Sequence, residues 1–200
     1  MAEARRQSGP AYLGLMQRIR VPLGFLLAPL LLIVAHPNRA SMALGAGVAL
    51  VGLALRAWAS GHLRKNDELT ISGPYAHTRN PLYLGTLVLG IGISICSGVL
   101  WFVALFGIAY LLVYVPVMIA EARTMRALFP DEYDRYSSRV PMFLPWALGG
   151  AGVQGGPVPG SGNKPSGRGF DSSLYLKHRE YRAAAGTLAV LLLLLIKEYF

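Results

Sequence analysis

The chain has 200 residues, of which 54% are hydrophobic and only 14% are charged, and its formal net charge is +9. A soluble domain carries about a quarter charged residues, so this composition points to contact with lipid. The basic excess fits an anionic membrane surface better than nucleic acid, and we expect no nucleic-acid partner. The single cysteine, Cys96, excludes an internal disulfide and is expected to be a small core residue.

Five apolar runs predict membrane-spanning helices at about 21–35, 41–60, 82–97, 99–120 and 183–196. No small-residue cleavage site follows the first run, and further spans come after it, so we interpret it as a helix and not as a signal peptide. The predicted fold is an all-α integral membrane protein, a bundle of about five transmembrane helices in one membrane domain over residues 1–200.

The connections between these helices predict how they pack. Gly45 and Gly52 favour close helix contact, because a nucleotide fingerprint would need a preceding strand. The third and fourth spans should form a tight hairpin, and EARTMRALF should extend the fourth helix to Pro130. DEYDRYSS predicts one or two more turns, and VPMFLPW is expected at the membrane interface. Residues 147–173 predict a flexible Gly/Pro connector, and Leu174 to Ile196 predict a last helix.

Basic residues gather on one side of the predicted bundle. With the N-terminus inside, segments 1–20, 61–81 and 121–182 hold four, three and nine of the 19 Lys and Arg residues. By the positive-inside rule, this distribution predicts a multi-pass protein whose N-terminus and polar loops are cytoplasmic.

The long polar interruption LTISGPYAHTRNPLYLG, residues 69–85, is either a simple turn or a ligand-binding loop. Glu121 and Glu180 lie at predicted membrane boundaries, where an ionisable group is functional or is paired with a neighbouring Arg. Arg56 either reaches the interface or belongs to a site. The four histidines, His36, His62, His77 and His178, lack metal-ligand spacing, so no metal site is expected.

These residues suit a reaction that needs few catalytic groups. Backbone groups freed at Gly73-Pro74 and Asn80-Pro81 can bind a nucleoside and an amino-acid tail. Methyl transfer from a sulfonium needs in-line positioning of the nucleophile and the donor, without a metal or a covalent intermediate.

SGPYAHTRNPLYLG, followed by EARTMRALFPDEYDRYSSRVPMFLP, resembles the isoprenylcysteine carboxyl methyltransferase family, within a wider group that includes phospholipid N-methyltransferases. The similarity covers about Leu69 to Pro145. It implies an integral membrane enzyme that uses S-adenosyl-L-methionine at a cytoplasmic cofactor-binding region. By position, it implies a cofactor site formed by the backbone of residues 67–70 and by His62, Lys65, Leu69, Thr70, Tyr75, Arg79, Asn80, Pro81, Tyr83 and Glu121.

The chain departs from the family pattern at four positions. Asn80 replaces a His, so the loop has no titrating group there, and Ala122 replaces the second Glu of a pair. Pro130 replaces a Gly, and Val117 stands where eukaryotic members carry a substrate-contacting Arg. The last change weakens the case for a prenylcysteine carboxylate as substrate.

The head of the last predicted helix, YLKHREYR, is expected to pack back on the bundle, face the cofactor chamber and help select the substrate. Glu180, Arg182 and Arg56 are therefore the candidate catalytic residues. Either arginine can replace the missing substrate-contacting Arg, and an amine acceptor could lose its proton to Glu121 or Glu180.

The predicted function is S-adenosyl-L-methionine-dependent methyl transfer to a lipophilic small-molecule or prenylcysteine-like acceptor at the membrane interface. Three alternatives stay open, namely a phospholipid or amine N-methyltransferase, an NADPH-dependent membrane sterol-type reductase and a non-catalytic membrane scaffold. The expected partners are the lipophilic substrate and membrane lipids, and no obligate protein partner is evident.

Overall fold

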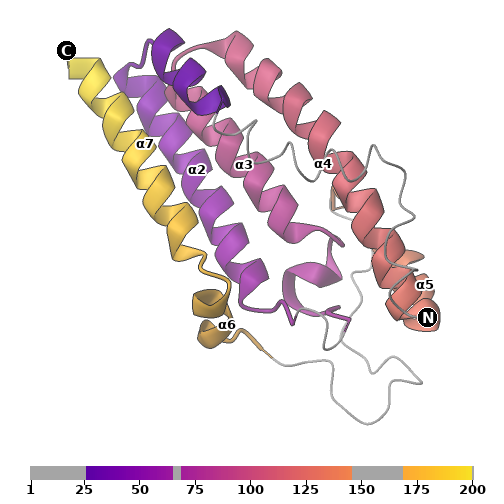
Figure 1. Cartoon of the computed structure of the whole chain (residues 1–200). Helices are drawn as coiled ribbons and strands as arrows, with labels where there is room; N and C mark the ends of the chain where they lie inside the picture. Colours follow the sequence, from indigo (N-terminus) through magenta and orange to yellow (C-terminus); the bar gives the residue numbers. More distant parts are fainter. Residues whose placement is uncertain (1–25, 65–68, 146–168, 200) are drawn as a thin grey trace.

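The computed structural model describes residues 26–64, 69–145 and 169–199, and these residues form helices and no strand. Residues 26–34 are helical. They are followed by α2 (Arg39–Ser60), the one-turn 3-10 helix η2 (Gly73–Ala76), α3 (Pro81–Cys96), α4 (Leu100–Leu128), α5 (Pro130–Ser137), α6 (Ser172–Lys177) and α7 (Tyr181–Tyr199). Figure 1 shows α7, α2, α3 and α4 side by side, with α5 and α6 at one end of them. The predicted all-α class is confirmed for these residues.

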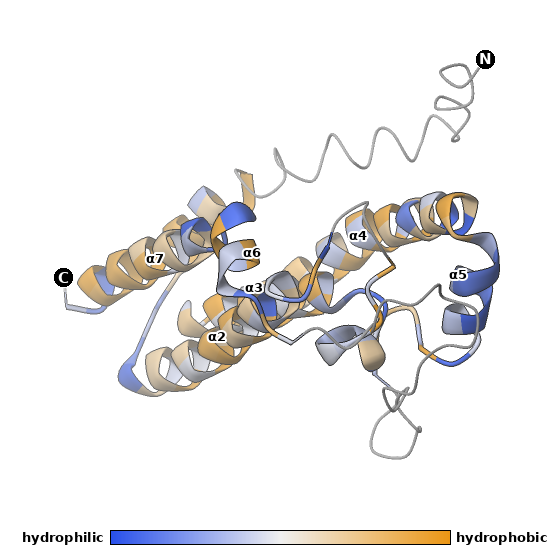
Figure 2. Ribbon diagram, turned by 90° about the horizontal axis from the view of Figure 1, so that it is seen from below, coloured by the Kyte–Doolittle hydropathy of each residue, from blue (hydrophilic) through white to orange (hydrophobic). Residues whose placement is uncertain are grey.

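The long helices bury little of their apolar surface. α2 and α4 are long and apolar enough to cross a membrane, and only 17% and 28% of their most apolar stretches are buried. Leu44, Leu50 and Leu112 are each more than 60% exposed, and Figure 2 shows apolar colouring along these helices. Such exposure is rare in soluble monomers, so these helices are suited to lipid. α3 is apolar but has only 16 residues, so it is shorter than α2 and α4. α7 differs from α2 and α4 because it carries the charged residues Arg182, Lys197 and Glu198 near its ends.

The C-terminal region differs from the single helix predicted over residues 174–196. It forms α6 and α7, separated at residues 178–180, where Arg179 has a φ of 56°. A side chain in this left-handed conformation ends a run of right-handed helix. α6 also begins one residue before the predicted end of the connector, because the Asp171 carboxylate accepts a 2.8 Å hydrogen bond from the backbone N–H of Ser173. The rest of the predicted connector, up to residue 168, and residues 21–25 of the first predicted span lie outside the described residues.

Close contact between α2 and α3 forms the centre of the bundle. A Cβ atom added at Gly52 would lie 2.4 Å from the backbone nitrogen of Leu89, so only glycine permits this approach. This confirms the predicted small-residue packing. At the far end, Cys96 is fully buried in a cluster with Leu31, Ala35, Phe102 and Leu194, as its predicted core role requires.

The α3–α4 hairpin brings the two sequence motifs to the same end of the bundle. Only residues 97–99 join the helices, and Gly98 adopts a φ of 72° in that turn. α4 continues to Leu128, and Pro130 then starts α5, because proline lacks the N–H that a continuing helix would need. As predicted, the start of α3 and the end of α4 therefore lie beside each other.

Candidate functional site

The polar turn that precedes α3 is shaped by Gly73. This residue has a φ of 59°, and a Cβ atom there would lie 2.6 Å from the His62 ring. The ring stays in place because His62 Nδ1 is 2.9 Å from the backbone oxygen of Trp58. Glycine is thus required both for the backbone conformation and for the space. The contact brings His62, which the sequence assigned only loosely, against the turn.

Three hydrogen bonds clamp the turn against residues 141–143, which follow α5. The Thr78 hydroxyl donates to the Phe143 carbonyl at 2.6 Å, and the Arg79 N–H donates to the Pro141 carbonyl at 3.0 Å. The Asn80 amide donates to the Met142 carbonyl at 2.7 Å. Asn80, predicted to contact a cofactor, therefore holds the loop in shape. The sequence did not predict this clamp, because VPMFLPW was expected only to lie at the membrane interface.

Two tyrosines of α5 lie beneath the turn. Tyr133 and Tyr136 are 5% and 7% exposed, and Leu69 and Ile71 pack against them. The Tyr136 hydroxyl donates to the Tyr75 carbonyl at 2.7 Å. Both rings are therefore part of the packing beneath the turn.

Arg79 connects the turn to α5. Its Nη1 donates to the Tyr133 hydroxyl at 3.0 Å, and its guanidinium lies 5.8 Å from the centre of that ring. The Nε atom of Arg79 is buried without a hydrogen-bond partner among the described residues. A buried donor of this kind costs stability unless another group satisfies it.

A hydrogen bond between Tyr83 and Glu121 joins the two motifs across the hairpin. The Tyr83 hydroxyl donates to Glu121 Oε1 at 2.7 Å. The Tyr83 ring packs edge-on against Tyr114 at 5.3 Å, and the Tyr110 hydroxyl donates to the Tyr83 carbonyl at 2.6 Å. Glu121 itself is exposed. An oriented and accessible carboxylate therefore stands at the mouth of the hairpin.

Tyr75 lies among the acidic groups of the site. Burial raises the pKa of its phenol far above the usual range, and the nearby Tyr136, Glu121, Tyr83 and Glu180 raise this pKa further. The phenol is consequently neutral at physiological pH and is able to donate a hydrogen bond.

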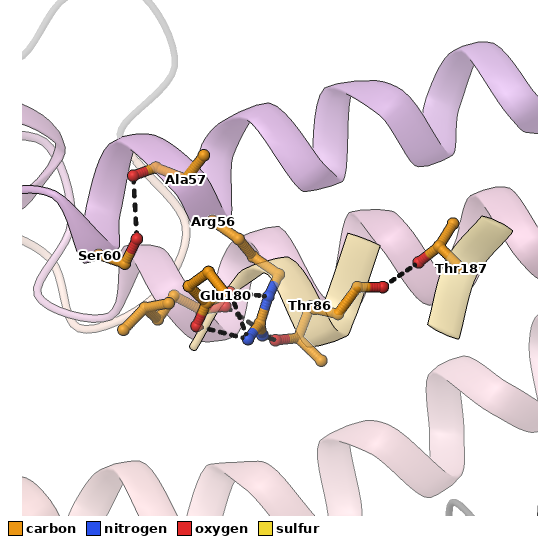
Figure 3. Close-up of polar contacts among 8 residues, drawn as sticks. Arg56, Ala57, Ser60, Thr86, Glu180 and Thr187 are labelled. Atoms are coloured by element: carbon orange, nitrogen blue, oxygen red, sulfur yellow. Dashed lines mark hydrogen bonds and ion pairs between the residues drawn. The ribbon is translucent and has the colours of Figure 1, made fainter. Parts of the chain in front are cut away.

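A second polar cluster joins α2, α3 and the break before α7 (Figure 3). Arg56 Nε donates to Glu180 Oε2 at 3.0 Å, and Nη2 donates to Oε1 at 2.9 Å. Arg56 Nη1 also donates to the Thr86 hydroxyl. Glu180 thus pairs with a distant arginine, and not with an arginine that neighbours it in the sequence. Arg182 is exposed in the first turn of α7 and does not join the cluster.

Two further predicted residues, Thr70 and Pro81, belong to the segment around the turn. The Arg64 N–H donates to the Thr70 hydroxyl at 3.2 Å, and His178 Nε2 is 3.1 Å from the Leu63 carbonyl. Pro81 is the buried first residue of α3. Lys65 lies outside the described residues. No three His, Cys, Asp or Glu residues within the described ranges lie close enough to hold a metal ion.

Comparison with known proteins identifies the segment that holds this arrangement. Residues 40–132 match the model of the phospholipid methyltransferase family. The cobalt-zinc-cadmium resistance protein CzcN of Cupriavidus metallidurans is 36% identical over 104 residues, which are 51% of this chain and 46% of that protein. The nickel-cobalt-cadmium resistance protein NccN of Alcaligenes xylosoxydans xylosoxydans is 34% identical over 104 residues, 51% of this chain and 47% of its own length.

The chain spans about half the length of the curated relatives that it matches. No solved structure matches it. The matched range includes α2, the polar turn, the α3–α4 hairpin and Glu121. The resemblance to the wider membrane methyltransferase group is therefore confirmed, and residues 40–132 carry the signature of the phospholipid methyltransferase family.

Proposed function

We propose that this protein transfers a methyl group from S-adenosyl-L-methionine to a lipophilic acceptor at the membrane interface. The observation that carries the proposal is the hydrogen bond between Tyr83 and Glu121, which sets an accessible carboxylate against the polar turn. The family match over residues 40–132 supports a methyltransferase kind of activity. The exposed apolar surfaces of α2 and α4 support action at a membrane.

The residues around the turn fit such a cofactor. A sulfonium and an amino group call for a carboxylate and aromatic faces, which Glu121, Tyr75 and Tyr83 offer. The cofactor's own carboxylate calls for a cation, and Arg79 has a buried Nε donor without a partner. We assign Glu121, Tyr75, Tyr83 and Arg79 to its charged and polar groups. We assign His62, Lys65, Leu69, Thr70, Asn80 and Pro81 to the loop that shapes its pocket.

When bound, S-adenosyl-L-methionine supplies an activated methyl group on sulfur. The protein contributes mainly position, because transfer needs the acceptor atom in line with that group. Tyr83 orients Glu121, and the clamp at residues 78–80 fixes the turn. Arg56 holds Glu180 at the acceptor end, and Glu180 takes a proton from an acceptor that must lose one. Arg182, which is outside this cluster, is assigned to the rim of the acceptor path.

Five membrane crossings with cytoplasmic polar loops complete the proposal. Figure 1 supports this arrangement, because η2, α5, α6 and the start of α7 lie at one end of the long helices. α3 and α7 then cross together with α2 and α4, and the run that includes residues 26–34 forms the first span. A water-soluble cofactor thus approaches from the side that holds Glu121.

Titration of the purified protein with S-adenosylhomocysteine and, separately, with NADPH tests the proposal. Micromolar binding of S-adenosylhomocysteine alone is expected. Binding of NADPH alone would indicate a reductase, and binding of neither would favour a scaffold. A labelled-methyl assay over prenylcysteines, phospholipids and lipophilic amines and acids then identifies the acceptor.

The variant Glu121→Gln sharpens this test because it keeps the shape of the side chain and removes its charge. We expect S-adenosylhomocysteine to bind roughly 10- to 100-fold more weakly, the usual cost of losing a charged hydrogen bond. Glu198→Gln, at the far end of α7, is the matched control and should bind normally. Equal affinity of both variants would remove Glu121 from the cofactor site.

A further inference from the structure

A small pocket lies between α2, which belongs to the segment that matches the family, and the C-terminal helices, which follow that segment. Its volume is about 280 Å³. α2 contributes an apolar wall, and α6, α7 and the break between them contribute the other side, so that the lining residues are Leu50, Leu53, Ala54, Ala57, Tyr175, Glu180 and Ala184. Leu50 is 63% exposed, so the pocket opens toward the lipid-facing surface.

The small side chains create the space in this pocket. Ala54 and Ala57 on α2 face Ala184 on α7, where larger residues would fill the gap between the helices. The volume lies just below the range for small-molecule sites, which is roughly 300–1,000 Å³. It therefore suits one hydrocarbon chain or a small ring and is too narrow for both chains of a phospholipid.

Glu180 gives the pocket a carboxylate at its polar end. Its side chain is only 10% exposed, although it lines the pocket. Arg56 is not part of the lining, because its guanidinium is engaged with the Glu180 carboxylate and the Thr86 hydroxyl. Among the described residues, Oε1 of Glu180 accepts one hydrogen bond, from Arg56 Nη2, and a carboxylate oxygen can accept a second.

From these observations we propose that the pocket binds a single-chain lipophilic amine, with its hydrocarbon between α2 and α7 and its ammonium group at Glu180. As the methyl acceptor, a role that rests on the proposed function, this amine meets a carboxylate of opposite charge. A fatty acid would instead place its carboxylate beside that of Glu180, and the repulsion between the two carboxylates would weaken its binding. The pocket thus selects the charge of the acceptor as well as its width.

The reaction balances with these groups. The ammonium head loses one proton to the Glu180 carboxylate, and the freed nitrogen lone pair forms the new N–C bond. The electron pair of the broken S–C bond stays on sulfur. Glu180 then returns the proton to water, since the break between α6 and α7 lies at the end of the bundle that holds the polar loops (Figure 1).

Photo-crosslinking tests the pocket without relying on methyl transfer. The full chain in nanodiscs of zwitterionic lipid is labelled with a diazirine derivative of dodecylamine, and unlabelled dodecylamine or dodecanoate is added as competitor. Labelling at the lining residues is expected, with dodecanoate competing at least about tenfold more weakly. In Glu180→Gln this preference should fall. Equal competition by the acid and the amine in the unaltered protein would overturn the proposal.

Two neighbouring alanines provide the matched variants. Ala184→Leu fills the pocket and should weaken dodecylamine binding about tenfold, the effect of excluding roughly two buried methylene groups. Ala185→Leu, at an exposed position next to it, should leave binding unchanged. An equal response of both variants would also overturn the proposal.

Binding of S-adenosylhomocysteine in the same nanodiscs separates the two proposals. If S-adenosylhomocysteine binds and dodecylamine does not compete for labelling, the pocket proposal fails and the proposed function stands. If dodecylamine competes and S-adenosylhomocysteine does not bind, the pocket exists and the proposed function fails.

Discussion

Single hydrogen bonds decide which residues around the polar turn can be exchanged. Asn80 donates a hydrogen from its amide to the Met142 carbonyl, whereas Asn38 accepts one from the Ser41 N–H at the start of α2. The two side chains are identical, but only the acceptor role can be taken over by a carboxylate. The direction of the bond, which a sequence does not reveal, therefore sets the tolerance of each position.

Asn80→Asp is expected to destabilise the fold by about 1–3 kcal/mol, because it places a carboxylate against a carbonyl oxygen. Asn38→Asp should change stability by less than about 0.5 kcal/mol, since Asp and Asn cap helices equally well. Thermal unfolding of both variants in the same lipid environment measures the difference. Similar unfolding temperatures would show that the clamp contributes nothing.

Gly73 offers a second test at this scale. Gly73→Ala should cost about 1–2 kcal/mol, because alanine is strained at a φ of 59° and its Cβ would meet the His62 ring. Gly107→Ala in α4 is the control, since nothing lies within 4 Å of its Cβ position and alanine favours a helix by roughly 0.5–1 kcal/mol. The free energies of unfolding should thus change in opposite directions.

Among the helices, the ion pair of Arg56 and Glu180 connects the C-terminal pair to the rest of the bundle. Both oxygens of the carboxylate are bound, and the side chains are only 20% and 10% exposed. At the other end of α7, Lys197 Nζ donates to the Leu32 and Ile33 carbonyls at 2.7 and 2.9 Å. α7 is therefore attached at both ends by polar contacts and by apolar packing between them.

A double-mutant cycle should reveal this connection. Arg56→Ala alone leaves a largely buried carboxylate without its partner and should cost about 3–5 kcal/mol. Glu180→Ala in the same chain should restore part of that loss, so that the double variant is more stable than Arg56→Ala. Strictly additive changes in the free energy of unfolding would mean that the pair is not coupled.

The sequence predicted the helices better than the contacts between them. Apolar periodicity and proline positions gave α2, the hairpin and α5 nearly to the residue, because these signals are local. The break at Arg179 was missed, since a left-handed residue other than glycine leaves no mark in composition. The partner of Glu180 was also missed, because Arg56 is 124 positions away and only the packing of α7 on α2 brings the two together.

The residues of the predicted site divide in a similar way. The resemblance selected Tyr83 and Glu121, and the structure shows them in contact. It also selected Asn80, whose amide is used within the protein. A motif records which positions matter to a family, but it does not say whether a side chain serves the ligand or the loop. That distinction required the three-dimensional contacts.

For the whole molecule, the positions of the loops predict which residues reach each side of the membrane. With Cys96 replaced by Ala, single cysteines at Ala40, His77 and Ser138, all of which are exposed, act as reporters. A membrane-impermeant maleimide added to intact cells should label Ala40→Cys only. His77→Cys and Ser138→Cys should react after the membrane is opened. Labelling of all three in intact cells would contradict the proposed orientation.

The shortness of α3 has a consequence for the lipid around it. Its 16 residues span about 24 Å at 1.5 Å per residue, against a hydrocarbon thickness of roughly 30 Å. A bilayer has to thin, or the helix has to sink, to match such a segment. Since Tyr83 lies in the first turn of α3, that adjustment draws the site toward the acyl chains from which a lipophilic substrate would come. The composition of the membrane, through its thickness, thereby becomes part of how the site is reached.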